Sequence, residues 1–395
     1  MTKMIMPTTR FEATREAFLN ALNEAVEVKF GALDKMHADY FNKELELIKN
    51  VPDEWLTTML IVSDMTKYMK WNYPNCISSD RGAIVSSFAA YLLDITGIDP
   101  VLYNLIPERF YVTALTNPIP MIDLDIATSC KEAAINYLQH VYGEECVFGC
   151  MCDVYKNGTI INRSKHACAL FISAEPYTGK INEMYADETV DELMAQGHMR
   201  INLVTSKPQE EIMKLSKGCD KFDPMMFKGM YNVLFDGAIS IPYELTLRYA
   251  SRYLKTFEDL VMSISISRPH GLRISECFKK RDSYGDDNMD EILAEINGHI
   301  VYQEQVCQLL QYILGINFME ANNLRKSIAK KNMIVVNDLF ANIIPLLINK
   351  GFYYETVINF WNDFVHAAIY GVSKAHFTVT AYDIARYAWL QKQMK

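Results

Sequence analysis

Two aspartates separated by one leucine, Asp123 and Asp125, constrain this chain more than any other feature of its sequence. They lie within the otherwise apolar segment 118–126, which is typical of a β-strand. Because side chains alternate between the faces of a strand, both carboxylates point to one face and Leu124 to the other. Two such charges repel unless a cation lies between them, and carboxylate oxygens suit Mg²⁺. The pattern predicts a divalent metal site, with the solvated face of an edge strand as the simpler alternative.

Length and composition limit the class of protein to which this strand belongs. The chain has 395 residues, 50% of them hydrophobic, which is enough to bury a large core and predicts two or three domains. A formal net charge of −9 argues against a protein that coats nucleic acid generally, so any DNA contact must be local. No apolar run has the length of a membrane span, and the N-terminus lacks the apolar core of a secretory signal. We therefore expect a soluble, cytoplasmic protein with no membrane partner.

The cysteines raise the question of a second kind of metal site. Nine are scattered along the chain, and none forms the paired spacing of a zinc knuckle. Cys146, Cys150, Cys152 and Cys168, with His166, leave zinc binding open. We interpret these cysteines as reduced thiols that pack as small apolar side chains.

The apolar periodicity predicts an α+β chain whose second half is almost entirely helical. In the first half we expect helices over residues 10–48, 53–71, 83–95 and 127–142, strands at 167–172 and 199–204, and a hairpin over 147–161. Helical periodicity dominates beyond Lys207, which predicts a domain boundary near residue 206. The polar turn at residues 78–82 precedes a helix and carries Arg81, an arrangement that suits an anion but also fits an ordinary helix cap.

A series of short motifs runs along the chain. In the first half they are Tyr40 to Ile48, Met59 to Asp64, Asp80 to Leu93, Ile106 to Phe110, the paired aspartates and Asn162 to Ala167. In the second half they are Phe257 to Leu260, Ser267 to Gly271, Tyr302 to Val306, Glu320 to Lys331 and Tyr370 to His376. Read in order, these motifs resemble those of the family C DNA polymerases, the catalytic alpha subunits of bacterial DNA polymerase III. The shared order and spacing of these motifs is more specific than any one of them.

The resemblance implies a polymerase-beta-like nucleotidyltransferase palm over residues 1–206 and largely α-helical fingers over residues 207–395. It implies a DNA polymerase that adds nucleotides to a 3′ end by two-metal phosphoryl transfer, with Mg²⁺ or Mn²⁺ held by Asp123 and Asp125. A nucleoside triphosphate and a primer-template nucleic acid are the implied substrates. Asn202 occupies the position of the family's third catalytic aspartate, and Asp223 is a weaker candidate for that role.

The resemblance also implies a set of residues that bind the nucleotide. They are Arg81, Gly82, Ala83, Lys165, His166, Arg200, Arg268, Arg325, Lys326, Lys330, Lys331, Lys374 and His376. Lys326 and Lys330 lie one helical turn apart with Arg325 and Lys331 beside them, which predicts a dense positive surface. A solvated helix end whose lysines complement the helix dipole explains the same residues more simply. The two histidines are equally compatible with structural roles.

Three departures from the family indicate reduced activity. Asn202 has no charge with which to balance a second divalent ion, and Ala83 replaces a serine, which removes one hydroxyl. The segment 143–161 is too short for the family's thumb, and no segment matches its phosphoesterase and clamp-binding regions. We therefore expect protein partners to supply the missing grip within a larger replication complex, in a bacterial or phage-infected cytoplasm. The alternative is a catalytically impaired polymerase-like protein with a binding, assembly or regulatory role in a bacterial or viral replisome.

Overall fold

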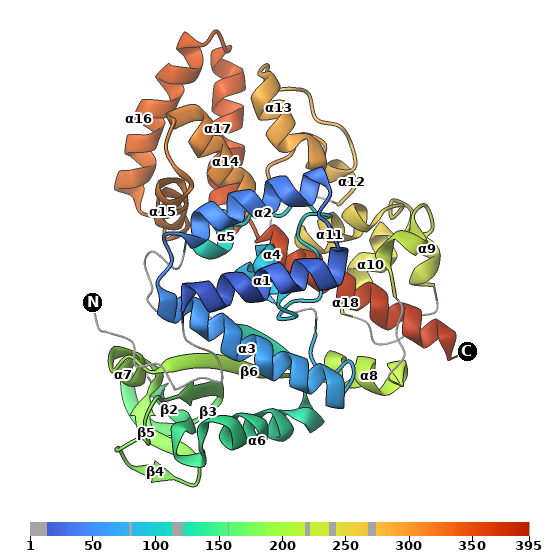
Figure 1. The fold of residues 1–395 in the computed structure, drawn as a ribbon. Helices are drawn as coiled ribbons and strands as arrows, with labels where there is room; N and C mark the ends of the chain where they lie inside the picture. Colours follow the sequence, from blue (N-terminus) through green and yellow to red (C-terminus); the bar gives the residue numbers. More distant parts are fainter. Residues whose placement is uncertain are drawn as a thin grey trace. The chain divides into compact units, whose positions relative to one another are not determined.

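The computed structural model describes residues 14–78, 81–112, 120, 122–156, 158–217, 222–236, 242–267 and 274–394. The chain divides into two compact units, residues 1–221 and residues 222–393. The first unit combines helices with a six-stranded mixed sheet (Figure 1). In the second unit, the described residues form helices joined by loops and one isolated β-bridge. The α+β class that the sequence predicts is confirmed.

The sheet of the first unit has the strand order β1-β6-β3-β2-β5-β4. The strands are β1 (Asp123–Ala127), β2 (Val147–Lys156), β3 (Thr159–Ile172), β4 (Ile181–Asn182), β5 (Tyr185–Thr189) and β6 (Met199–Ser206). β1 runs parallel to β6 and β2 parallel to β5, whereas the other neighbouring pairs are antiparallel. The aspartate strand β1 thus lies at the end of the strand order, with β6 as its neighbour.

Most of these strands follow from the sequence pattern. The hairpin of β2 and β3 turns between Lys156 and Thr159, as predicted. β3 continues to Ile172, so the strand predicted at 167–172 is its second half. β4 and β5 were not predicted, because they are short and their sequence is largely polar, with no sustained apolar alternation.

The first unit also contains helices, some of which pack against the sheet and others against one another. They are α1 (Arg15–Phe30), α2 (Lys35–Ile48), α3 (Asp53–Asn72), α4 (Phe88–Leu92), α5 (Glu108–Tyr111), α6 (Lys131–Tyr142), α7 (Val190–Ala195) and α8 (Lys207–Ser216). The helical pattern over 10–48 is divided because Gly31, with a φ of 68°, ends α1. Asp34 then caps α2, since its side chain accepts a hydrogen bond from the His37 backbone N–H at 2.9 Å. The predicted helix over 83–95 is likewise divided, into the 3-10 turn η1 (Gly82–Ser86) and α4.

The two faces of β1 differ in how far their side chains are buried. Leu124 and Ile126 are fully buried, whereas Asp123 and Asp125 are half-buried. α8 packs against β1, and α6 packs against α3 and β2. α8 belongs to this first unit, although we placed the residues from 207 onward with the fingers. The assignment of the two units as palm and fingers stays a prediction.

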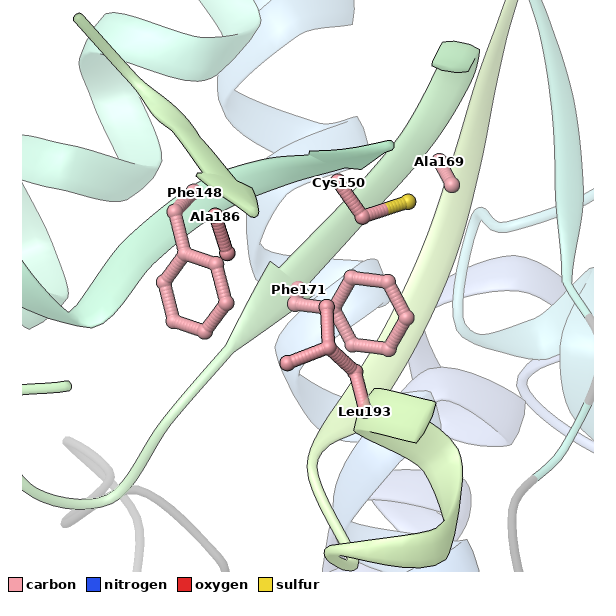
Figure 2. Close-up of a cluster of buried hydrophobic side chains, with 6 residues drawn as sticks. All are labelled: Phe148, Cys150, Ala169, Phe171, Ala186 and Leu193. Atoms are coloured by element: carbon pink, nitrogen blue, oxygen red, sulfur yellow. The ribbon is translucent and has the colours of Figure 1, made fainter. Parts of the chain in front are cut away.

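A compact apolar cluster fills the space between β2, β3, β5 and α7 (Figure 2). Its members are Phe148, Cys150, Ala169, Phe171, Ala186 and Leu193. Burial raises the pKa of the Cys150 thiol to about 12, so the thiol stays neutral and packs as an apolar group. Among the described residues, no three histidine, cysteine or acidic side chains gather as a metal-binding group.

The second unit is built from helices of very different length. It contains η4 (Pro224–Phe227), α9 (Tyr231–Leu234), α10 (Glu244–Ala250), α11 (Phe257–Ser265), α12 (Ile274–Cys277), α13 (Asp287–Leu293), η5 (Ala294–Ile296), α14 (Gln303–Leu314), α15 (Phe318–Ala329), α16 (Met333–Asn349), α17 (Tyr354–Tyr370) and α18 (Lys374–Gln393). α14, α15, α16 and α17 pack together, and α11 packs against α18. Within the described ranges, no helix combines the length and the hydropathy of a membrane span.

Candidate active site

Two carboxylates and a carboxamide lie together on the neighbouring strands β1 and β6. Asp123 lies opposite Asn202 in the parallel pair, so the two side chains share a face. Nδ2 of Asn202 donates a hydrogen bond to Oδ1 of Asp123 at 2.5 Å, and Asn202 is only 6% exposed. Asp125 follows two residues after Asp123 and points to the same face because of the strand period. Asp223, the weaker candidate, instead caps η4 in the second unit.

Arg81 reaches this pair of strands from the turn before η1. Its Nη1 donates to Oδ1 of Asp125 at 3.1 Å. The turn is held against β1 because the backbone N–H of Ser78 donates to the carbonyl of Asp125 at 2.9 Å. Gly82 follows with a φ of 82°, a left-handed conformation that favours glycine, and Ala83 continues η1. Burial raises the pKa of Asp125, while the positive charge of Arg81 opposes that shift.

Arg200 fixes the carboxamide of Asn202 from the other side. It lies two residues earlier on β6, and its Nε donates to Oδ1 of Asn202 at 3.1 Å. Its Nη1 lies 3.8 Å from the sulfur of Met194 on α7. Asn202 is therefore held at both ends, since its oxygen accepts from a guanidinium and its nitrogen donates to Asp123.

A bulge in β3 borders this group of side chains. Gly149 of β2 is paired with Leu170 of β3, and Met151 is paired with Lys165. The pairing thus moves two residues along β2 but five along β3, so the extra residues lie in β3. The bulged residues come directly before Ala169, which lies opposite Asn202 on β6. Bulges of this kind redirect side chains and are frequent beside active sites.

His166 lies in the bulge, near the positive side chains of Arg200 and Lys131. Its Nδ1 accepts a hydrogen bond from the backbone N–H of Ala169 at 3.0 Å. Burial, together with the positive charges of Arg200 and Lys131, lowers the pKa of His166, so the imidazole is neutral at physiological pH.

Lys131, the first residue of α6, belongs to this cluster and was not predicted. Its Nζ donates to the carbonyl oxygen of Ala167 at 2.5 Å, which ties α6 to the bulge. Burial lowers the pKa of Lys131. No local signal marks this lysine, because its contact depends on a bulge more than thirty residues away in the sequence.

The structure does not bring Lys165 into the cluster. Lys165 forms an ion pair with Glu183, and its Nζ lies 4.8 Å from the ring centroid of Tyr185 on β5. Three strands separate β5 from β1 in the strand order. Nucleotide binding by Lys165 stays a prediction, and its contacts lie away from the two aspartates.

The basic helix of the second unit differs from its prediction at one residue. Lys326, Lys330 and Lys331 are exposed near the end of α15. Arg325 is only 6% exposed, and its Nε and Nη2 donate to Oδ1 of Asn322 at 3.2 and 3.0 Å. Arg325 thus supports the helix packing and does not extend the positive surface.

The remaining predicted residues also lie in the second unit. Lys374 is 6% exposed and forms an ion pair with Glu295 at 2.7 Å, so its charge is matched inside this unit. His376 is half-buried on α18. Arg268 lies outside the described residues. The involvement of His376 and of the exposed lysines in nucleotide binding stays a prediction.

Fold and site together define an α+β protein with a helical second unit, in which two carboxylates and an arginine on neighbouring strands meet a second arginine from a preceding turn. Two family models match this chain. The bacterial DNA polymerase III alpha NTPase domain matches residues 15–156, and the finger domain of the bacterial DNA polymerase III alpha subunit matches residues 252–351.

Curated relatives agree with these matches. The DNA polymerase III alpha subunit of Helicobacter pylori is 23% identical, over 98% of this chain and 40% of the relative. Those of Treponema pallidum and Aquifex aeolicus are 23% and 22% identical, over 89% and 94% of this chain and 37% and 42% of the relatives. The chain belongs to the bacterial DNA polymerase III alpha family as a diverged member, and it spans about 40% of the length of these relatives.

Proposed function

We propose that this protein is a template-dependent nucleotidyltransferase that adds nucleotides to a primer 3′ end as part of a larger replication complex. The observation that carries the proposal is the convergence of Asp123, Asp125 and Asn202 with Arg81 and Arg200 on β1 and β6. Membership of the polymerase III alpha family supports this class of reaction. Protein partners that help to hold the primer and template are part of the proposal.

The donor set fits a divalent cation. Asp123 and Asp125 supply hard carboxylate oxygens from one face of β1, which suits Mg²⁺ or Mn²⁺. When bound, such an ion stabilises the negative charge that develops on the transferred phosphoryl group. The Arg81 side chain is 37% exposed, so its guanidinium is accessible to a phosphate oxygen beside the Asp125 carboxylate.

The proposed reaction forms one bond and breaks another. The 3′ hydroxyl oxygen bonds to the α-phosphorus, the bond from that phosphorus to the β-phosphate oxygen breaks, pyrophosphate leaves, and the hydroxyl proton passes to solvent. The work of the protein is to align the two reactants and to stabilise the added negative charge. Arg81 and Arg200 supply fixed positive charge on the face that carries the two aspartates.

Primer extension tests this proposal. The wild-type protein should extend a labelled primer-template in the presence of Mg²⁺ or Mn²⁺, and Asp123→Ala should lower the rate by about 100-fold or more. Asp191→Asn is a matched control, because Asp191 is an exposed carboxylate on α7 of the same unit. Equal extension by wild type and Asp123→Ala would contradict the proposal.

The hydrogen bonds of Asn202 favour a second candidate, an impaired polymerase-like protein with a binding or assembly role. Asn202 donates to Asp123 and Arg81 pairs with Asp125, so both carboxylates already have partners within the chain. Calorimetric titration with Mg²⁺ and a nucleoside triphosphate separates the two candidates. Measurable metal-dependent binding favours catalysis, and no binding by wild type or by Asn202→Asp favours the assembly role.

A further inference from the structure

We infer that Arg200, held in place by Asn202, supplies a permanent positive charge in place of one metal ion, so that this site binds a single divalent cation. The inference rests on the proposed function of the same site. Its basis is the orientation of one carboxamide and the balance of charge around it.

The carboxamide of Asn202 presents its donor end to the aspartates. A guanidinium has only donors, so the Asn202 oxygen faces Nε of Arg200, at 3.1 Å. The amide nitrogen is consequently turned toward Oδ1 of Asp123, at 2.5 Å. A third carboxylate at this position would offer oxygen ligands to a cation, whereas the N–H group of Asn202 carries a partial positive charge and repels one.

The two carboxylates match the charge of one divalent ion, and the two arginines beside them oppose the binding of a second. Asp123 and Asp125 contribute two negative charges, and Arg81 and Arg200 contribute two positive charges on the same group of side chains. Two divalent ions would add four positive charges with only two carboxylates as charged ligands. In a partly buried site such an excess is strongly unfavourable, so a second ion has little to hold it.

Arg200 is placed to act on a phosphate. It is half-buried, its Nε is committed to Asn202, and its Nη1 contacts Met194. Its Nη2 makes no hydrogen bond with the described residues. Because an arginine stays charged at every physiological pH, this group is a fixed cation that needs no metal concentration to be present.

Counting bound Mn²⁺ tests the inference directly. Electron paramagnetic resonance of the full chain titrated with Mn²⁺ alone should show one bound ion in the wild type and in the control Asp191→Asn. The double variant Asn202→Asp with Arg200→Gln restores a carboxylate and removes the competing guanidinium, and it should bind two. Thermal unfolding of the double variant close to that of the wild type establishes that the count comes from a folded protein.

A second measurement reports on the charge of Arg200. Arg200→Gln alone should still bind one Mn²⁺, and it should weaken binding of an Mn²⁺-loaded, non-hydrolysable nucleoside triphosphate analogue by about tenfold, because a charge-assisted hydrogen bond is lost. Unchanged analogue affinity would overturn the role of Arg200.

The outcomes separate this inference from the proposed function. Two Mn²⁺ ions in the wild type would overturn the inference and leave the polymerase proposal intact. One ion in both the wild type and the double variant would show that Asn202 and Arg200 do not set the count. No ion in the wild type would overturn both. One ion in the wild type and two in the double variant is the supporting result, whatever the outcome of primer extension.

Discussion

Glu44 shows how a single residue shapes the turn that carries Arg81. Its carboxylate is fully buried on α2 and accepts hydrogen bonds from the Ser87 hydroxyl at 2.6 Å, the Tyr111 hydroxyl at 2.7 Å and the Phe88 backbone N–H at 2.8 Å. Glu44 thus caps the start of α4, just after η1. Burial raises the pKa of Glu44 to about 7, although its hydrogen bonds act in the opposite direction.

This carboxylate predicts a specific pH dependence of stability. Its pKa in the folded state lies above that in the unfolded chain, so between about pH 5 and pH 7 the folded state binds the proton more tightly. The free energy of unfolding should therefore fall as the pH rises through this window, by about 3 kcal/mol from this group, and should level off at higher pH.

Glu44→Gln should remove that slope. It should also cost about 1–3 kcal/mol at pH 5, because the amide nitrogen of glutamine cannot accept the hydrogen bonds that one carboxyl oxygen of Glu44 accepts. Urea unfolding followed by tryptophan fluorescence at pH 5, 6, 7 and 8 measures both effects. Glu46→Gln, on the exposed side of the same helix, is the matched control. If Glu44→Gln keeps the wild-type slope of unfolding free energy against pH, other groups must cause the pH dependence.

At the scale of elements, the junction between α17 and α18 depends on close backbone packing at Gly371. Its φ of −59° is accessible to any residue, so conformational freedom is not the reason for glycine. A Cβ at this position would overlap the carbonyl oxygen of Ala367 and lie 3.0 Å from that of Val301. The β-bridge between Tyr302 and Val372 holds these segments together.

Gly371→Ala should therefore destabilise the second unit by about 3 kcal/mol, at the upper end of what overpacking costs. Gly315→Ala, at the end of α14, is the control. It has a positive φ and open space around the added methyl group, so it should cost only about 1 kcal/mol. Chemical denaturation of both variants gives the comparison. Equal losses would show that the two carbonyls move aside without cost.

The elements also show which features can be read from sequence. α3 has an acidic first turn followed by a long apolar segment, and β1 has strict alternation. These are strong local signals, and both elements were predicted. The break between η1 and α4 depends on Glu44, about forty residues earlier, and the contact of Lys131 depends on the bulge in β3. Such features come from tertiary contacts, which local periodicity does not encode.

At the scale of the whole molecule, a net charge of −9 limits the proposed binding of nucleic acid to a few local contacts. Several basic residues predicted to bind the nucleotide have acidic or internal partners. Lys165 pairs with Glu183, Lys374 pairs with Glu295, and Arg325 is buried. Three other predicted residues, Lys326, Lys330 and Lys331 near the end of α15, are exposed. The two groups of basic residues differ in their burial and in their partners, which a single sequence does not show.

Primer-template binding by the isolated chain should therefore depend only moderately on salt. If Lys326, Lys330 and Lys331 make the main phosphate contacts, a plot of log affinity against log salt concentration should have a slope of about −3. Lys330→Glu combined with Lys331→Glu should weaken binding and reduce the slope by about two units. Lys214→Glu, an exposed lysine on α8 with two acidic neighbours, is the control and should leave the slope unchanged. Fluorescence anisotropy of a labelled duplex between 50 and 200 mM salt measures these slopes. A wild-type slope steeper than about −6 would reveal a larger basic surface than these three lysines provide.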